Sequence, residues 1–289
     1  MILQEPEQSQ FDWQFRIFGI PVRVHPWFWI VSIMLGFSAL RDNKGPEGFL
    51  YLGIWVACVF VSVLVHELGH VCAGLYFGSE GHIVLYSFGG LAVGSSNLTD
   101  RWQRIIVMFA GPAAGFILFA LVAAGVWLYD PMMVTNLLRA LVWLDWVRGD
   151  WPRWAERLVI DLFAINLFWG LINLLPIWPL DGGQISRELF LKYTENDGVR
   201  KSLILSIVVS VAFALNALIG WIKDEPFIPY LPKGDAFQTI FFGLFAAMSW
   251  QLLQQTARGG RAGPGRYRME DESYERAPWE RDPDWWKRG

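Results

Sequence analysis

The chain is poor in charged residues. Of its 289 residues only 18% are charged, against 54% that are hydrophobic. Soluble domains carry about a quarter charged residues, so the composition argues against that class. Abundant apolar residues with a net charge of only −3 also argue against an intrinsically disordered chain. Because basic and acidic residues nearly balance, the chain has no basic excess for nucleic acid, and we predict no nucleic-acid partner.

Cysteine is equally scarce. The chain has two cysteines, Cys58 and Cys72, in one apolar stretch. On a continuous helix they would lie roughly 21 Å apart along the axis, which is too far for a disulfide. We interpret both as small buried hydrophobic residues. Residues 1–23 lack a basic segment followed by an apolar one, so no cleavable signal peptide is expected.

Long apolar stretches and many aromatic residues, including 17 Trp and 21 Phe, take the place of charge. A helix that crosses a bilayer needs about 20 residues, and Trp gathers at membrane surfaces. We therefore predict an all-α polytopic membrane protein embedded in a lipid bilayer. About six transmembrane helices are expected, at residues 26–40, 49–77, 105–129, 158–179, 203–222 and 237–253. The stretch 132–154, with several Trp and Arg, is interpreted as an interfacial connection.

Short membrane-associated β structure is expected in two places. Phe15–Val24 is β-branched and aromatic, which predicts one or two short strands at the membrane surface. Ile83–Val93 is strand-like on both sides of Gly89-Gly90, which predicts a hairpin with its turn at the glycines. The chain is accordingly divided into an N-terminal surface segment (1–23), a six-span domain (24–255) and a disordered polar tail (256–289).

An even number of spans places both termini on the same side of the membrane. Basic residues outside the spans are more numerous on that side once the arginines at the start of the tail are counted. The positive-inside rule then predicts that both termini are cytoplasmic, in a multi-pass protein of the cell (inner) membrane.

The residues that point to chemistry begin in the second apolar stretch, which reads H-E-L-G-H over residues 66–70. Residues i and i+4 lie on one side of a helix, so the imidazoles of His66 and His70 can bind one metal ion. Two imidazoles with a carboxylate and an open fourth position suit zinc. Glu67 can approach a water at that position as a general base. The alternative is that both histidines only hydrogen-bond to neighbouring helices, although ionisable residues inside a span are usually functional.

A third ligand is expected at the end of the fourth apolar stretch, which reads N-L-L-P-I-W-P-L-D-G-G over residues 173–183. The prolines interrupt helical hydrogen bonding, and Gly182-Gly183 permits unusual backbone angles. Asp181 lies at this break. The second and fourth spans run in the same direction, so Asp181 lies toward the same membrane face as the two histidines. The alternative role for Asp181 is that of a helix N-cap.

Together the two motifs resemble the site-2 protease family of intramembrane metalloproteases. The resemblance implies that His66, His70 and Asp181 bind one Zn²⁺ ion and that Glu67 is the catalytic base. It also implies a catalytic role for Asn173 near the reacting carbonyl, as a donor to developing negative charge. From the residues alone, Asn173 fits a hydrogen bond between two helices equally well.

The hairpin expected at residues 83–93 is similar to one that follows the first motif in the same family. There a free strand edge can hold an unwound substrate by β-addition. A plain connecting hairpin is the alternative. Family members often add a PDZ domain or a CBS pair, and no stretch here is long enough for either. Regulation, including by a membrane partner, is left open.

The function that the resemblance implies is regulated intramembrane proteolysis. The chain would hydrolyse a peptide bond within or near the transmembrane helix of a membrane-protein substrate. Two other classes stay open. One is a non-catalytic membrane scaffold that keeps zinc as a structural ion. The other is a metal transporter, for which Asp161, Asn166 and Asn216 are the main polar candidates along a path.

Overall fold

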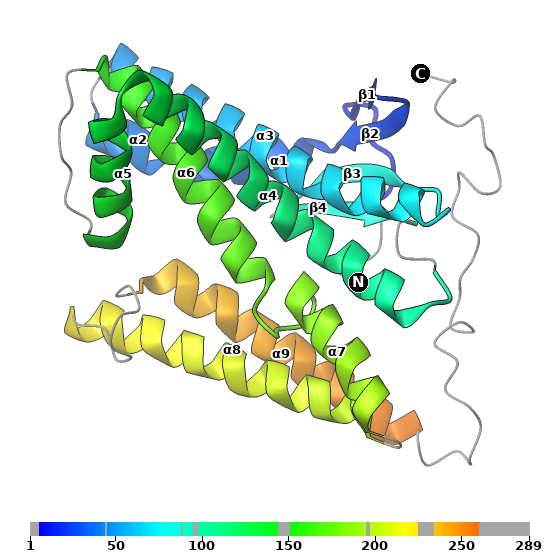
Figure 1. Ribbon diagram of the computed structural model, residues 1–289. Helices are drawn as coiled ribbons and strands as arrows, with labels where there is room; N and C mark the ends of the chain where they lie inside the picture. The colour runs from blue at the N-terminus through cyan, green and yellow to red at the C-terminus, as the bar shows by residue number, and fades with distance from the viewer. Residues whose placement is uncertain are drawn as a thin grey trace. The chain divides into compact units, whose positions relative to one another are not determined.

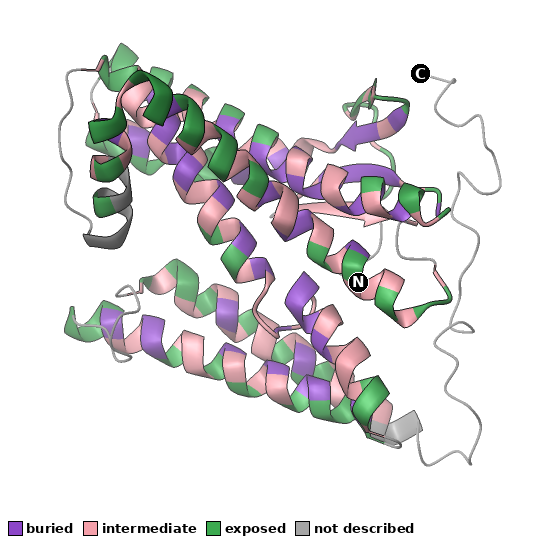
Figure 2. Ribbon diagram, in the orientation of Figure 1, coloured by how far each residue is buried: buried purple, intermediate pink, exposed green. Residues whose placement is uncertain are grey.

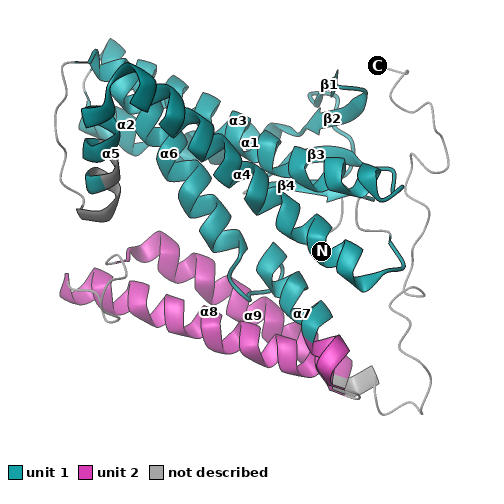
Figure 3. Cartoon of the chain, in the orientation of Figure 1, with its two compact units in different colours: residues 1–189 teal, residues 190–289 magenta. Residues whose placement is uncertain are grey.

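A computed structural model describes residues 6–43, 45–87, 89–94, 98–143, 151–194, 197–224 and 234–259. The chain divides into two compact units, residues 1–189 and residues 190–289 (Figure 3). All three of the predicted metal ligands belong to the first unit.

One four-stranded sheet lies in the first unit, with the strand order β1-β2-β3-β4 (Figure 1). Its strands are β1 (Trp13–Ile17), β2 (Ile20–Val24), β3 (His82–Tyr86) and β4 (Gly89–Val93). Strands β1 and β2 form one antiparallel hairpin and β3 and β4 form another, and β2 runs parallel to β3. The two central strands are mostly buried (Figure 2) because their aliphatic side chains join one hydrophobic core with α1 and α3. This order leaves β4 at an edge of the sheet.

The sheet confirms the predicted β structure but corrects the position of one turn. Tyr86 pairs with Gly89, so the second hairpin turns before Gly89 and not at Gly89-Gly90. Ser87 has a φ of 50°, the left-handed conformation that tight hairpin turns require. Both glycines therefore belong to β4, and their small size serves packing and not a turn.

Three long helices pack together in the first unit (Figure 1). They are α3 (Pro46–Tyr76), α4 (Arg101–Tyr129) and α6 (Arg153–Asn173). A β-carbon at Gly69 of α3 would overlap the carbonyl of Ala110 on α4, so small residues allow these two helices to approach closely. The shorter helices are α1 (Pro26–Leu35), α2 (Ser38–Asp42), α5 (Pro131–Trp143) and α7 (Asp181–Tyr193), which continues into the second unit.

The described part of the second unit is built around a pair of helices, α8 (Gly198–Lys223) and α9 (Ala236–Gly259). Buried Ser206 and Ser249 join them through hydroxyl oxygens 2.7 Å apart. Helix α9 extends past residue 256, where the polar tail was predicted to begin. The rest of that predicted tail, residues 260–289, lies outside the described residues.

Four described helices are long and apolar enough to cross a membrane: α3, α4, α8 and residues 236–256 of α9. The predicted number of six spans is not confirmed. Residues 26–40 form α1, whose ten residues extend only about 15 Å, followed by α2. Helix α6 has 21 residues, but charged side chains occupy its first half and it is not among the four. The predicted interfacial connection contains α5, and its residues 144–150 lie outside the described part.

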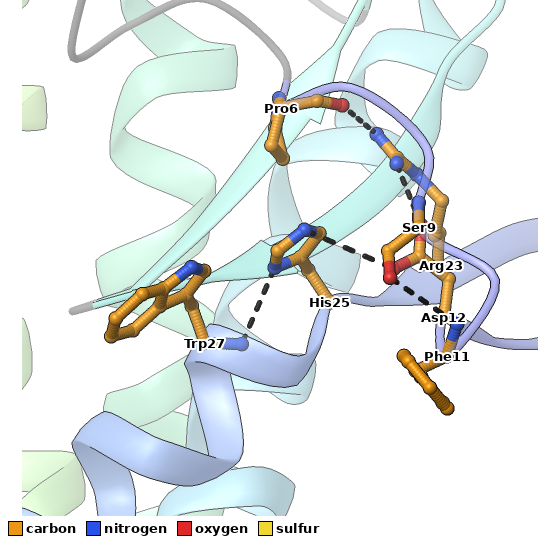
Figure 4. A network of polar contacts seen from close by, with 7 residues as sticks. All are labelled: Pro6, Ser9, Phe11, Asp12, Arg23, His25 and Trp27. Atoms are coloured by element: carbon orange, nitrogen blue, oxygen red, sulfur yellow. Dashed lines mark hydrogen bonds and ion pairs between the residues drawn. The ribbon is translucent and has the colours of Figure 1, made fainter.

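A buried ion pair joins the N-terminal segment to the sheet (Figure 4). Arg23 on β2 donates from Nη1 to Asp12 Oδ2 and from Nη2 to the Pro6 carbonyl, both at 2.9 Å. The Arg23 and Asp12 side chains are each 1% exposed. His25 lies beside them, and its Nδ1 accepts the N–H of Trp27 to cap α1. The pair thus holds the chain that leads into the sheet.

Replacing Arg23 with methionine should destabilise the fold by about 3–5 kcal/mol, because the Asp12 carboxylate would stay buried without its partner. Thermal unfolding of the purified protein in detergent measures the change. Arg41→Met is the matched control, since Arg41 forms an ion pair with Asp42 at the surface, where its side chain is 76% exposed. The control should change stability by less than about 1 kcal/mol. Equal unfolding temperatures for the two variants would contradict this prediction.

Candidate metal centre

The structure brings the three predicted ligands together although they come from distant parts of the sequence. His66 Nε2 lies 3.1 Å from Asp181 Oδ2, and His70 Nε2 lies 3.4 Å from the same oxygen. The two Nε2 atoms are 3.2 Å apart. All three residues are buried, and they form the metal-ligand cluster found among the described residues.

Helix α4 sets the orientation of His70. The Nδ1 of His70 donates to the carbonyl of Val107 at 2.7 Å, which leaves the lone pair on Nε2 directed at the cluster. One turn further along α4, a β-carbon at Gly111 would overlap the His70 imidazole. The absence of a side chain at Gly111 therefore makes room for this ring against the helix.

Asp181 reaches the histidines from the first residue of α7. The preceding loop folds tightly over this helix start, and a β-carbon at Gly182 or Gly183 would overlap the backbone of the loop. Neither glycine has a positive φ. Close approach, and not the unusual backbone angles predicted from the sequence, explains the glycine pair. Burial raises the pKa of the Asp181 carboxyl, but the facing imidazoles outweigh it and lower the pKa to about 2, so the carboxylate form is favoured.

Glu67 lies beside the cluster and contacts β4. A β-carbon at Gly90 would overlap the Glu67 side chain, so this glycine admits the carboxylate next to the strand. The backbone N–H of Ala92 donates a hydrogen bond to Glu67. The carboxylate is buried and oriented by the strand, which leaves it next to the three candidate ligands without being one of them.

The donor set fits a zinc ion. Two imidazole nitrogens and a carboxylate oxygen are ligands that zinc accepts, with bonds of about 2.0–2.2 Å. At such bond lengths a tetrahedral site separates its ligand atoms by about 3.3 Å. The three separations in the structure, 3.1, 3.2 and 3.4 Å, agree with this value. Three lone-pair donors this close together in a buried site need a shared cation or proton.

Asn173 lies at the end of α6 and is 7% exposed. Its side-chain N–H donates to the carbonyl of Trp169, one turn earlier in the same helix, at 2.9 Å. The described hydrogen bond is therefore within one helix and not between two.

Comparison with known proteins identifies the family. Residues 54–217, more than half of the chain and including every residue of this cluster, match the model of peptidase family M50. The chain belongs to the M50, or site-2 protease, family. Together with its four candidate spans, this membership makes the chain an integral membrane protein.

Individual relatives agree with the M50 family. A putative zinc metalloprotease of Synechocystis is 31% identical over 88% of this chain and 61% of its own length. Stage IV sporulation protein FB of Bacillus subtilis is 28% identical over 70% of this chain and 58% of its own length. The chain thus spans about three fifths of these relatives. The site-2 protease structure from Methanocaldococcus jannaschii aligns with a TM-score of 0.48 at 21% identity, covering 83% of this chain and 94% of that one.

Sequence reasoning missed three contributors to this M50 centre. Gly90 was assigned to a turn, and Ala92 to an unremarkable strand position, because nothing local shows that β4 contacts Glu67. Gly111 is the third contributor. The tripeptide Ala110-Gly111-Pro112 does contain a signal, since a small residue within a span marks close approach by another group.

Replacing Gly111 with alanine should reduce zinc binding by the purified protein about tenfold or more, because the added methyl group would displace the His70 ring from its place beside Val107. Zinc content after dialysis against a graded chelator measures this. Gly125→Ala is the matched control, since a β-carbon at Gly125 of the same helix meets no atom within 4 Å. Loss of zinc from both variants, or from neither, would refute the proposed contact.

Proposed function

We propose that this chain is an intramembrane zinc metalloprotease. It would hydrolyse a peptide bond within or near the transmembrane helix of a membrane-protein substrate. The observation that carries the proposal is the buried His66, His70 and Asp181 cluster with Glu67 beside it, since three of the four lie on α3, a helix apolar enough to cross the bilayer. M50 membership and relatives named as zinc metalloproteases support the same activity.

His66, His70 and Asp181 would hold one zinc ion through the three atoms that converge in the structure. When bound, zinc supplies a Lewis acid that polarises the scissile carbonyl and acidifies water. Glu67 would take the proton from the attacking water and deliver it to the leaving amide nitrogen. The N–H of Ala92 donates a hydrogen bond to Glu67 and holds its carboxylate in place.

Strand β4 is the element best placed to receive the substrate. In a two-residue hairpin the pair of residues that flanks the turn, here Tyr86 and Gly89, is hydrogen-bonded. Hydrogen-bonded and non-hydrogen-bonded pairs then alternate along the two strands. Gly90 and Ala92 belong to non-hydrogen-bonded pairs, so their backbone N–H and C=O groups point away from β3. A substrate helix hides its amides in its own hydrogen bonds and must unwind before hydrolysis. An unwound segment added to this edge would lie beside Glu67.

Asn173 is proposed as a donor to the negative charge that develops on the scissile carbonyl oxygen. In the described structure one of its N–H groups donates to the Trp169 carbonyl in the same helix. The catalytic role therefore requires the amide to use its second N–H or to rotate when substrate binds.

The two other classes find less support. A scaffold with structural zinc has no need of a general base, yet Glu67 lies beside the ligands. A transporter needs free polar groups along a path. Asn166 instead donates to Ser62 on α3 and to its own helix, and Asp161 accepts from Arg157. The Asn166–Ser62 bond joins α6 to α3, as expected of a polar residue between helices, and the Arg157–Asp161 pair lies within α6.

The membrane context is also part of the proposal. We place the protein in the cell (inner) membrane with both termini cytoplasmic, on the basis of the positive-inside rule. Three further points stay predictions. They are the division into a surface segment (1–23), a protease domain (24–255) and a polar tail (256–289), the presence of six transmembrane helices, and the existence of a regulatory membrane partner.

Replacing Glu67 with glutamine should lower the rate of cleavage roughly a hundred- to ten-thousandfold while zinc stays bound, because glutamine keeps the shape but accepts no proton. The assay uses full-length protein in vesicles with a single-span substrate, and zinc is measured in the same preparation. Asp181→Ala is the companion variant and should lose both zinc and activity. Undiminished cleavage by the glutamine variant would remove Glu67 from the mechanism, and a zinc-loaded wild type without hydrolysis would favour the scaffold.

A further inference from the structure

The position of Asp181 depends on what holds α7. The extensive packing between helices in this unit joins α3 to α4 and α6, and no pair that includes α7 is among the extensively packed described elements. The loop that leads into α7 from α6 contains Pro176 and Pro179 and only short turns. This loop packs closely against the start of α7 at Gly182 and Gly183, and a second attachment further along the helix would fix its direction relative to the histidines.

Side chains from α4 provide that attachment. Arg104 donates to both carboxylate oxygens of Glu188 on α7, from Nε at 3.1 Å and from Nη2 at 2.9 Å. Its remaining nitrogen, Nη1, donates to the carbonyls of Leu98 and Thr99 at 2.6 and 3.1 Å. Arg101 adds a second positive charge 3.4 Å from Glu188. The guanidinium is thus fixed by the backbone before α4 and binds Glu188 with two parallel hydrogen bonds.

The helical register links this ion pair to the metal centre on both sides. Glu188 lies seven residues after Asp181, so the two share one side of α7, two turns apart. On α4, Arg104 lies three residues before Val107 and seven before Gly111. One face of α4 therefore orients His70 and, two turns away, binds the helix that carries the third ligand.

We infer that Arg104 and Glu188 form a positioning pair that holds Asp181 within coordinating distance of His66 and His70. The inference rests on the proposed metal site. Neither member of the pair touches the three ligand atoms. Their effect on metal binding passes through Asp181, because the pair sets where the start of α7 lies relative to α3.

The competing explanation is that the ion pair only stabilises the fold. The Arg104 and Glu188 side chains are 26% and 17% exposed, and partly exposed ion pairs contribute little to unfolding free energy. A positioning role and a purely stabilising role therefore differ in what they change. If the pair positions Asp181, breaking it lowers zinc affinity, and does so only while Asp181 is present. If the pair only stabilises the fold, breaking it lowers the free energy of unfolding whether or not Asp181 is present.

The test is zinc affinity of the full-length protein in detergent, measured by competition with a chromophoric chelator, for Glu188→Gln in the wild-type and in the Asp181→Ala background. We expect Glu188→Gln to weaken zinc binding about tenfold in the wild-type background, and to cause no further loss once Asp181 is absent. Arg104→Lys, which keeps the charge but not the paired hydrogen bonds, should show a smaller loss of the same kind. Asp42→Asn, which breaks the exposed ion pair with Arg41, should leave zinc affinity unchanged.

Two results would overturn the inference. One is wild-type zinc affinity in Glu188→Gln, and the other is an equal loss of affinity with and without Asp181. Cobalt substituted for zinc provides a second readout, because its visible absorption reports ligand geometry and should change in Glu188→Gln even if the fold is retained. Failure of the wild type to bind zinc or cobalt at all would instead contradict the proposed metal site, so the two failures are distinguishable.

Discussion

Two imidazole nitrogens and a carboxylate oxygen, held within 3.4 Å of one another in a buried site, are stable together only when a cation or a proton lies among them. Nearly every local feature around the centre follows from this convergence. Gly111 makes room for one ring, Val107 sets its tautomer, and Gly182-Gly183 lets the loop fold over the start of α7. These are backbone and glycine contributions, which place ligands without adding further charge to an apolar interior.

Helix α4 organises the centre without supplying a ligand. Its first turn binds α7 through Arg104, the carbonyl of Val107 one turn later accepts the hydrogen bond of His70, and its small residues let α3 approach. A single rigid helix that touches both ligand-bearing elements keeps their separation constant. The sheet contributes in a comparable way, because β4, an edge strand in the described sheet, orients Glu67 through the N–H of Ala92. The proposed general base and the proposed substrate site are thus held by the same strand.

Much of the fold could be predicted from hydropathy and β propensity. The long apolar stretches mark α3, α4, α8 and α9, and the β-branched segments mark all four strands. The differences have physical causes. Residues 26–40 are apolar enough for a predicted span, but the structure forms the ten-residue helix α1 there, packed against the sheet, and then the start of α2. Hydropathy does not distinguish these cases, because apolar residues are favoured both in a protein core and in lipid. Gly89-Gly90 resembles a turn because glycine suits both turns and close contacts.

The sequence alone determined the chemistry of the candidate centre. Histidines four residues apart must share a helix face, and Glu67 between them must lie near whatever they bind, because helix geometry is local. It also pointed to Asp181, through the parallel direction of two distant apolar stretches. Only the tertiary structure decided that Asp181 lies within 3.4 Å of both imidazoles, that β4 holds Glu67, and that Arg104 binds α7. Those contacts join residues that are far apart in the sequence. Their distances depend on how whole helices pack against one another, and a local sequence pattern does not contain that information.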